Sequence, residues 1–237
     1  MIRTALLTHG VGPLASASFQ ALRKHTDLRY VALSQRSGSR GLRSKLRTYG
    51  MWFAAQEAIK RSSVACYGHR IDHRMLSDHG VERIGWSKKE DGADVARTLV
   101  SAGVEVVIIS GFNFILNSDF LSRIPLVLNV HPSLLPDLRG RRPVVWGLLR
   151  RDEHFGVTIH EVDTGIDTGP IVAQARIPRP RFPVVSLIEH RLSKAVDELL
   201  PRVIREVEAG ELSRTPQGSG AYFPEPTLQH RSRFELP

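Results

Sequence analysis

The segment LVLNVHPSLLPDLRG, Leu126–Gly140, starts as an apolar run and continues into a loop rich in leucine and proline. Its first part is typical of a strand buried on both faces, yet Asn129 and His131 near the end of that part are polar. Side chains two residues apart point to the same side of a strand, so we expect both to face one cavity. Pro132 then ends the strand.

Two interpretations of this polar pair are open. An amide beside an imidazole can donate hydrogen bonds to an oxygen that gains negative charge during acyl transfer. Alternatively, His131 satisfies a backbone group at the edge of the sheet and Asn129 caps the loop. The carboxyl end of a parallel strand is where open α/β sheets bind their ligands, which favours the first interpretation without deciding it.

The apolar patterning on either side of this segment alternates strands with helices. The expected strands are 3–10, 28–34, 104–111, 124–131, 155–162 and 170–177, and the expected helices are 14–25, 41–63, 91–103, 143–152 and 185–209. This alternation indicates an α/β fold with a Rossmann-like, mostly parallel twisted sheet and helices on both faces. We expect one domain, residues 1–210, and a short C-terminal extension, residues 211–237.

The composition favours a soluble globular protein of the cytoplasm. The chain has 237 residues, of which 41% are hydrophobic and 24% charged, which suits one large globular domain. A single cysteine, Cys66, leaves no internal disulfide and no cysteine-based zinc site, so we expect a reducing cytoplasm and no metal. No apolar run has the length of a membrane-spanning helix, and the N-terminus becomes polar too early for a signal peptide.

The formal charge of +9 is unevenly distributed along the chain. Between Gln35 and Gln56 there is no acidic residue, and the basic residues are Arg36, Arg40, Arg43, Lys45 and Arg47. Such a segment is a solvated helix face, a site for phosphate groups or a membrane-surface contact, and the sequence leaves these three readings open.

A second motif, VDTGIDTGP, spans Val162–Pro170 and holds two Asp-Thr-Gly turns in tandem. It follows an expected strand, so Asp163 and Asp167 should lie at the sheet edge that carries Asn129 and His131. A carboxylate beside an imidazole can fix its tautomer, raise its pKa and pass protons. The alternative is a purely structural Asx turn. An aspartic protease would need two such strands far apart in an all-β fold, which the patterning disfavours.

With the turn GFNFIL at Gly111–Leu116, these motifs resemble the folate-dependent formyltransferases. That family includes glycinamide ribonucleotide, methionyl-tRNA and sugar N-formyltransferases. The resemblance covers Val104–Gly169, where the order and spacing of GF-x-x-IL, LNVHPSLLP-x-x-RG, GVTIH and D-x-G-x-DTGP all agree. It implies a formyltransferase-type fold and 10-formyltetrahydrofolate as co-substrate.

The resemblance also implies roles for individual residues. Asn129 and His131 match the pair that stabilises the oxyanion, with His131 also a proton donor, and Asp167 matches the aspartate that tunes this histidine and assists proton transfer. The residues that match contacts to the folate are Asn113, Phe114, Ile115, Leu116, Ser133, Leu134, Leu135 and Pro136.

The acceptor is the part that the resemblance leaves open. We expect a small anionic amine, such as a phosphorylated or nucleotide-linked amino sugar, with Gly10, Gly12, Arg40 and Arg43 as candidate contacts. The rivals are a glycinamide ribonucleotide enzyme, a methionyl-tRNA enzyme, a formyltetrahydrofolate deformylase and a non-enzymatic nucleic-acid binder. The charge favours tRNA, whereas the extension 211–237 is short for a tRNA-binding domain.

Overall fold

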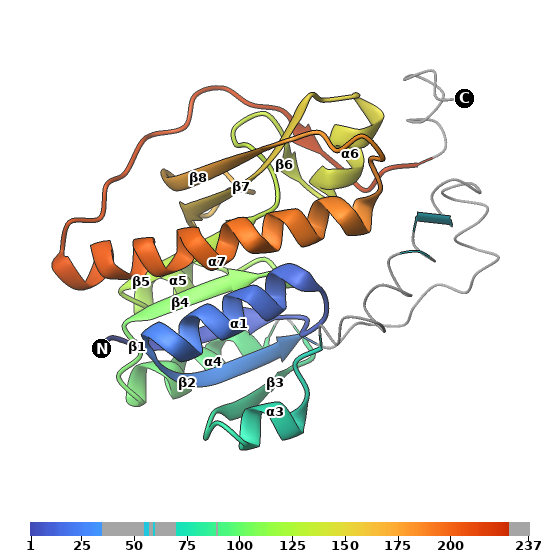
Figure 1. Ribbon diagram of the computed structural model, residues 1–237. Helices are drawn as coiled ribbons and strands as arrows, with labels where there is room; N and C mark the ends of the chain where they lie inside the picture. The colour runs from blue at the N-terminus through green and yellow to red at the C-terminus, as the bar shows by residue number, and fades with distance from the viewer. Residues whose placement is uncertain (35–54, 57–58, 60–69, 89, 228–237) are drawn as a thin grey trace.

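The structure, a computed structural model, describes residues 1–34, 55–56, 59, 70–88 and 90–227. These residues contain a seven-stranded sheet with the strand order β3-β2-β1-β4-β5-β7-β8 (Figure 1). Its strands are β1 (Arg3–Thr8), β2 (Asp27–Ser34), β3 (Glu82–Trp86), β4 (Val106–Ser110), β5 (Leu126–His131), β7 (His154–Glu161) and β8 (Ile171–Pro178).

The sheet is mostly parallel, as the alternation of strands and helices predicts. Strands β3, β2, β1, β4 and β5 pair in parallel, while β7 pairs antiparallel with both β5 and β8. The antiparallel register puts Asn129 of β5 opposite His160 of β7. The end of β5 therefore meets residues of the neighbouring strand as well as the loop that follows it.

Helices cover both faces of the sheet, as expected. Helices α1 (Pro13–His25) and α7 (Val185–Ala209) share one hydrophobic cluster with Leu6, Ile108 and Leu128 of the strands. Helices α4 (Asp91–Ser101) and α5 (Ser118–Arg123) share a second cluster, on the other face, with the strand residues Ala5, Leu7, Val107 and Val127. The central strands are thus buried on both sides, which explains their continuous apolar runs.

The remaining elements lie at the carboxyl edge or at the end of the sheet. Helix α3 (His73–Ser77) precedes β3, and helix α6 (Pro143–Leu149) follows the loop after β5. The segment after α7 returns along the molecule, and its strand β9 (Tyr222–Phe223) pairs in parallel with β6 (Arg139–Gly140) (Figure 1). Most of the expected helix 41–63 and the whole basic segment 36–47 lie outside the described residues.

Ile108 in the centre of β4 is fully buried in the hydrophobic cluster under α1 and α7. We therefore expect its side chain to contribute to the stability of the fold. Ile108→Ala should lower the free energy of unfolding by about 2–5 kcal/mol, because it removes buried methylene groups and leaves a cavity. Val100→Ala on the exposed side of α4, where the side chain is 47% exposed, should change it by less than about 0.5 kcal/mol. Urea denaturation of both variants measures this difference, and similar losses in the two would contradict the assigned packing.

Candidate active site

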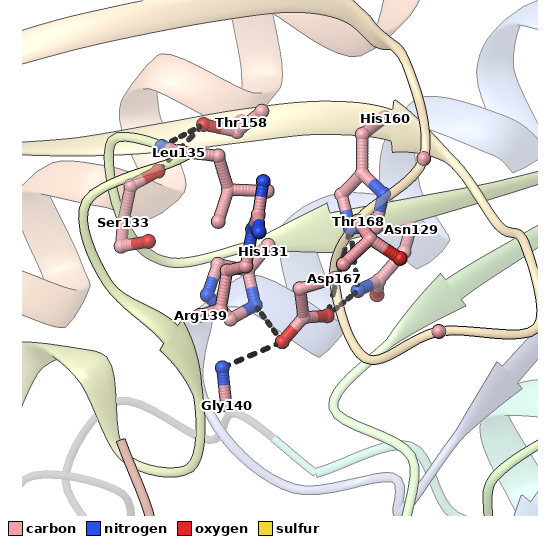
Figure 2. Close-up of polar contacts among 12 residues, drawn as sticks. Asn129, His131, Ser133, Leu135, Arg139, Gly140, Thr158, His160, Asp167 and Thr168 are labelled. Carbon is pink, nitrogen blue, oxygen red and sulfur yellow. Dashed lines mark hydrogen bonds and ion pairs between the residues drawn. The ribbon is translucent and has the colours of Figure 1, made fainter. Parts of the chain in front are cut away.

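A polar cluster lies at the carboxyl end of β5, in a cavity of about 620 Å³. Asn129 and His131 come from β5, His160 from β7, and Asp167 from the loop between β7 and β8. Figure 2 shows the four side chains converging, with Asp167 between the other three. All four line the cavity. The structure thus brings together the three residues that the sequence predicts to be catalytic.

The Asp167 carboxylate is the centre of this cluster. Its Oδ2 accepts a hydrogen bond from the Gly140 backbone N–H at 2.8 Å and lies 3.6 Å from His131 Nδ1. Its Oδ1 accepts a hydrogen bond of 3.2 Å from the Asn129 amide and lies 3.6 Å from His160 Nε2. Its side chain is only 13% exposed, so these groups replace most of the water that would otherwise solvate the charge.

The surroundings of Asp167 keep it ionised. Burial alone would raise the pKa of this carboxyl, but the nearby His131 and His160 and the Gly140 N–H together lower the pKa to about 2. The backbone of Asp167 has φ 53°, in the left-handed region that non-glycine residues seldom adopt. An ionised carboxylate in a cavity, on a residue with a strained backbone, is a frequent sign of a functional site.

His131 is buried and its tautomer follows from its contacts. Nε2 lies 3.0 Å from the carbonyl oxygen of Leu138. A carbonyl only accepts, so Nε2 carries the proton and Nδ1 is the nitrogen that faces Asp167. Burial lowers the pKa of His131, against the opposing effect of Asp167, so the ring is neutral at pH 7. Nδ1 is therefore available to take up a proton, and Asp167 stabilises the cation that would form.

His160 is a member of the cluster that the sequence does not single out. Its Nδ1 donates to the Glu161 carbonyl at 2.7 Å, so its Nε2 accepts a hydrogen bond of 3.1 Å from the Asn129 amide. Both hydrogens of the Asn129 amide are thereby used, one on His160 and one on Asp167. In the sequence, His160 ends the GVTIH motif of the family resemblance, to which no role was assigned.

The C-terminal segment holds the Asp167 loop in place. Gln217 donates from Nε2 to the carbonyls of Asp167 at 3.1 Å and Gly169 at 2.6 Å. Its Oε1 accepts from the Arg139 guanidinium at 3.2 and 2.9 Å. Arg139 directly precedes Gly140, where a side chain would collide with the Phe223 carbonyl of β9. The contacts therefore form a ring that joins β6, the Asp167 loop and the C-terminal segment.

An apolar wall completes the cavity and comes from the turn after β4. The predicted residues Asn113–Leu116 line it, together with Phe112. Phe112 and Phe114 pack against Trp86, with ring centroids 4.9 and 6.1 Å away. Ile115 is 63% exposed even though it is large and apolar, so it presents hydrophobic surface to whatever enters the cavity.

The other predicted contacts are not brought to this cavity. Ser133–Pro136 are absent from its lining, because the loop turns into the protein: the Thr158 hydroxyl accepts from the Leu135 N–H at 3.1 Å and donates to the Ser133 carbonyl at 2.7 Å. Ser133 and Leu134 line a separate pocket of about 270 Å³. Gly10 and Gly12 do not line the cavity, although Val11 between them does. Arg40 and Arg43 lie outside the described residues.

Among the residues that the structure describes, no group of three or more His, Cys, Asp or Glu side chains could hold a metal ion. In the same residues, no helix is both long enough and apolar enough to cross a bilayer.

Comparison with known proteins gives one family. A family profile described as "Formyl transferase" matches residues 3–204. Methionyl-tRNA formyltransferase of Syntrophus aciditrophicus is 39% identical over 114 residues, which are 48% of this chain and 36% of that protein. Methionyl-tRNA formyltransferase of Deinococcus radiodurans is 35% identical over 150 residues, 62% of this chain and 46% of that protein. The matched stretches span less than half the length of these curated relatives.

Solved structures share the fold at lower identity. Glycinamide ribonucleotide transformylase 1 from Symbiobacterium toebii has a TM-score of 0.68 at 22% identity, covering 92% of this chain and 95% of that one. The sugar 3N-formyl transferase WlaRD, solved with dTDP and 5-N-formyl-THF, has a TM-score of 0.61 at 16% identity, covering 95% and 70%. HypX from Aquifex aeolicus in complex with tetrahydrofolic acid has a TM-score of 0.62 at 14% identity, covering 97% and 31%.

The lowered pKa of His131 makes folding sensitive to pH. The unfolded chain takes up a proton near pH 6.5 that the folded chain resists, so the free energy of unfolding should fall as pH drops below about 6.5. The slope from this one group is at most about 1.4 kcal/mol per pH unit. Urea denaturation between pH 8 and 5 should show a smaller fall for His131→Gln than for the wild type. Equal slopes would contradict a buried neutral histidine.

The ring through Gln217 predicts coupled stability. Gln217→Ala should lower the free energy of unfolding by about 1–3 kcal/mol, because it leaves the Arg139 guanidinium and two carbonyls without this partner. Gln20→Ala on the exposed face of α1 is the matched control and should cost less than about 0.5 kcal/mol. A double-mutant cycle with Arg139→Ala should give a coupling of at least about 0.5 kcal/mol, and additive effects would exclude the ring.

Proposed function

Because this chain belongs to the formyl transferase family, we propose that it transfers the formyl group of 10-formyltetrahydrofolate to the amine of a small acceptor. The observation that carries this proposal is the convergence of Asn129, His131 and Asp167 in one cavity, at the sheet edge where α/β folds bind ligands. The aromatic and apolar turn at Phe112–Leu116 suits a flat heterocycle such as the folate head.

The geometry supports different roles for His131 and Asp167 in proton transfer. The amine must lose a proton as it forms a bond to the formyl carbon, and the departing folate nitrogen must gain one. We propose that Nδ1 of His131, which has no proton in the neutral ring, takes up this proton. Asp167, with a pKa of about 2, is too weak a base at neutral pH and instead stabilises the protonated histidine.

Asn129 is the proposed donor to the oxygen that becomes negative during transfer. Its two amide hydrogens are already bonded to His160 and Asp167, so it must exchange one of them for the oxyanion. His160, which accepts one of these bonds at 3.1 Å, is thus proposed to hold the Asn129 amide in position between turnovers.

The acceptor is proposed to be a phosphorylated or nucleotide-linked amine, and the tRNA alternative has a specific support. The sequence relatives named above are methionyl-tRNA formyltransferases, whereas the structural neighbours include ribonucleotide and sugar enzymes. An assay of tetrahydrofolate release from 10-formyltetrahydrofolate separates them. Its arms are glycinamide ribonucleotide, nucleotide-linked amino sugars, methionyl-tRNA and no amine; release in the last arm would indicate a deformylase that uses water.

Alanine at Asn129, His131 or Asp167 should lower turnover by about two to four orders of magnitude, the usual range for losing an oxyanion donor or an acid–base group. Affinity for the folate should change little, since the apolar turn is untouched. The effects should not add in a double variant, because the three groups act as one unit. His73→Gln on α3 is the control and should keep wild-type turnover. Wild-type turnover in any two of the three alanine variants would refute the assignment.

A further inference from the structure

Two adjacent arginines and a glutamate form a charged part of the cavity wall. Arg141, Arg142 and Glu225 all line the cavity, and so does Tyr222 from β9. This part is anchored by α6, whose Val144 and Val145 belong to the hydrophobic cluster under α1 and α7.

The apolar wall, formed by the turn at Phe112–Leu116, is anchored on the other side of the sheet. Phe112 and Phe114 pack against the cluster under α4 and α5. The charged and the apolar walls are therefore built from cores on opposite faces of the sheet, and the polar cluster at the end of β5 lies where the two meet. A cavity of this kind can hold two different ligands.

The two guanidinium groups converge on one carboxylate. Arg141 Nε lies 2.9 Å from Glu225 Oε2, and Arg142 Nε lies 2.6 Å from Glu225 Oε1. Each carboxylate oxygen thus has its own arginine. The side chains of Arg141, Arg142 and Glu225 are 66%, 28% and 27% exposed, so a ligand in the cavity can reach all three.

The two arginines suit an anion that carries more negative charge than the Glu225 carboxylate. Arg141 and Arg142 both pair with Glu225, whose carboxylate carries one negative charge. A phosphate carries close to two negative charges and three acceptor oxygens, and arginine binds such groups through paired hydrogen bonds. A phosphate would therefore neutralise the two arginines more completely than Glu225 does.

The backbone at this point is strained. Arg142 has φ 52°, in the left-handed region that non-glycine residues seldom adopt. The residue stands just before Pro143, the first residue of α6. The fold maintains this conformation at a residue whose side chain faces the cavity, which is typical of a binding site.

We propose that Arg141 and Arg142 bind the phosphate or diphosphate of the acceptor, and that Glu225 occupies this anion site until the acceptor displaces it. The proposal rests on the proposed function, because it assigns the acceptor side of the same cavity. Gly140 directly precedes Arg141 and donates to Asp167, and both arginines line the cavity that holds the polar cluster. The acceptor is then an amine that carries a phosphate ester or a diphosphate.

Binding of inorganic pyrophosphate to the whole protein tests the site without any formyl donor or acceptor. By isothermal titration at low salt, Arg141→Gln and Arg142→Gln should each weaken pyrophosphate binding by about tenfold or more, the usual effect of losing a charged hydrogen-bond partner. Glu225→Gln should strengthen it several-fold, since it removes the competing charge. Arg97→Gln on α4, outside the cavity, is the matched control and should bind pyrophosphate like the wild type.

Arginine variants that bind pyrophosphate like the wild type, or a Glu225→Gln that binds it no more tightly, would overturn the proposal. If Arg142→Gln does not fold, Arg142→Gly removes the guanidinium and tolerates the left-handed backbone, and it should show the same loss.

A second arm separates the acceptor's phosphate from the other anion that could enter the cavity, the carboxylate tail of the folate. The affinity for 10-formyltetrahydrofolate should stay within about twofold of wild type in the arginine variants, because the proposal places the folate on the other wall; a twofold change in affinity is only about 0.4 kcal/mol. Loss of folate affinity with unchanged pyrophosphate binding would overturn the proposal. Pyrophosphate binding as expected, without formyl transfer to any amine, would refute the proposed function and leave the anion site standing.

Discussion

The buried carboxylate of Asp167 is the constraint on which the rest of the site depends. An ionised group that is 13% exposed must find its hydrogen-bond donors within the protein. Those donors come from separate parts of the chain: the Asn129 amide of β5 and the Gly140 N–H of β6. His131 and His160 complete the shell, each 3.6 Å away. The register of β5, the loop that carries Asp167 and the position of β6 must all be compatible with these contacts.

That constraint explains why the segment after α7 belongs to the site. β6 has two residues, too few to keep its position by its own pairing. It is held by β9, by the Gln217 ring and by the Trp146 indole, which donates to the Pro224 carbonyl at 2.9 Å. The contact of Gly140 with the carboxylate therefore relies on residues more than 75 positions further along the chain. The same segment carries Glu225 into the cavity, so one return of the chain both supports Asp167 and shapes the charged wall.

How much could be predicted from the sequence depends on whether a residue's place follows from local periodicity. Asn129 and His131 were predictable, because a strand has a period of two and its end is known from Pro132. The role of His160 was not, because the motif GVTIH does not reveal its partner, and the antiparallel pairing of β7 with β5 is a tertiary fact. Gln217 lies in a segment without periodicity. β3 was missed because its sequence, ERIGW, lacks the apolar run of the buried strands.

The ground-state contacts of Asn129 bear on how the site could favour a transition state over a bound substrate. Its amide hydrogens are shared between His160 and the negative Asp167. A neutral formyl oxygen is a weaker acceptor than a carboxylate, so it competes poorly for either hydrogen. An oxygen that has gained charge competes well, especially once His131 has taken up a proton and drawn Asp167 towards its own Nδ1. Proton transfer to the histidine and release of the Asn129 amide would then favour each other, so that the strongest binding develops only as the charge does.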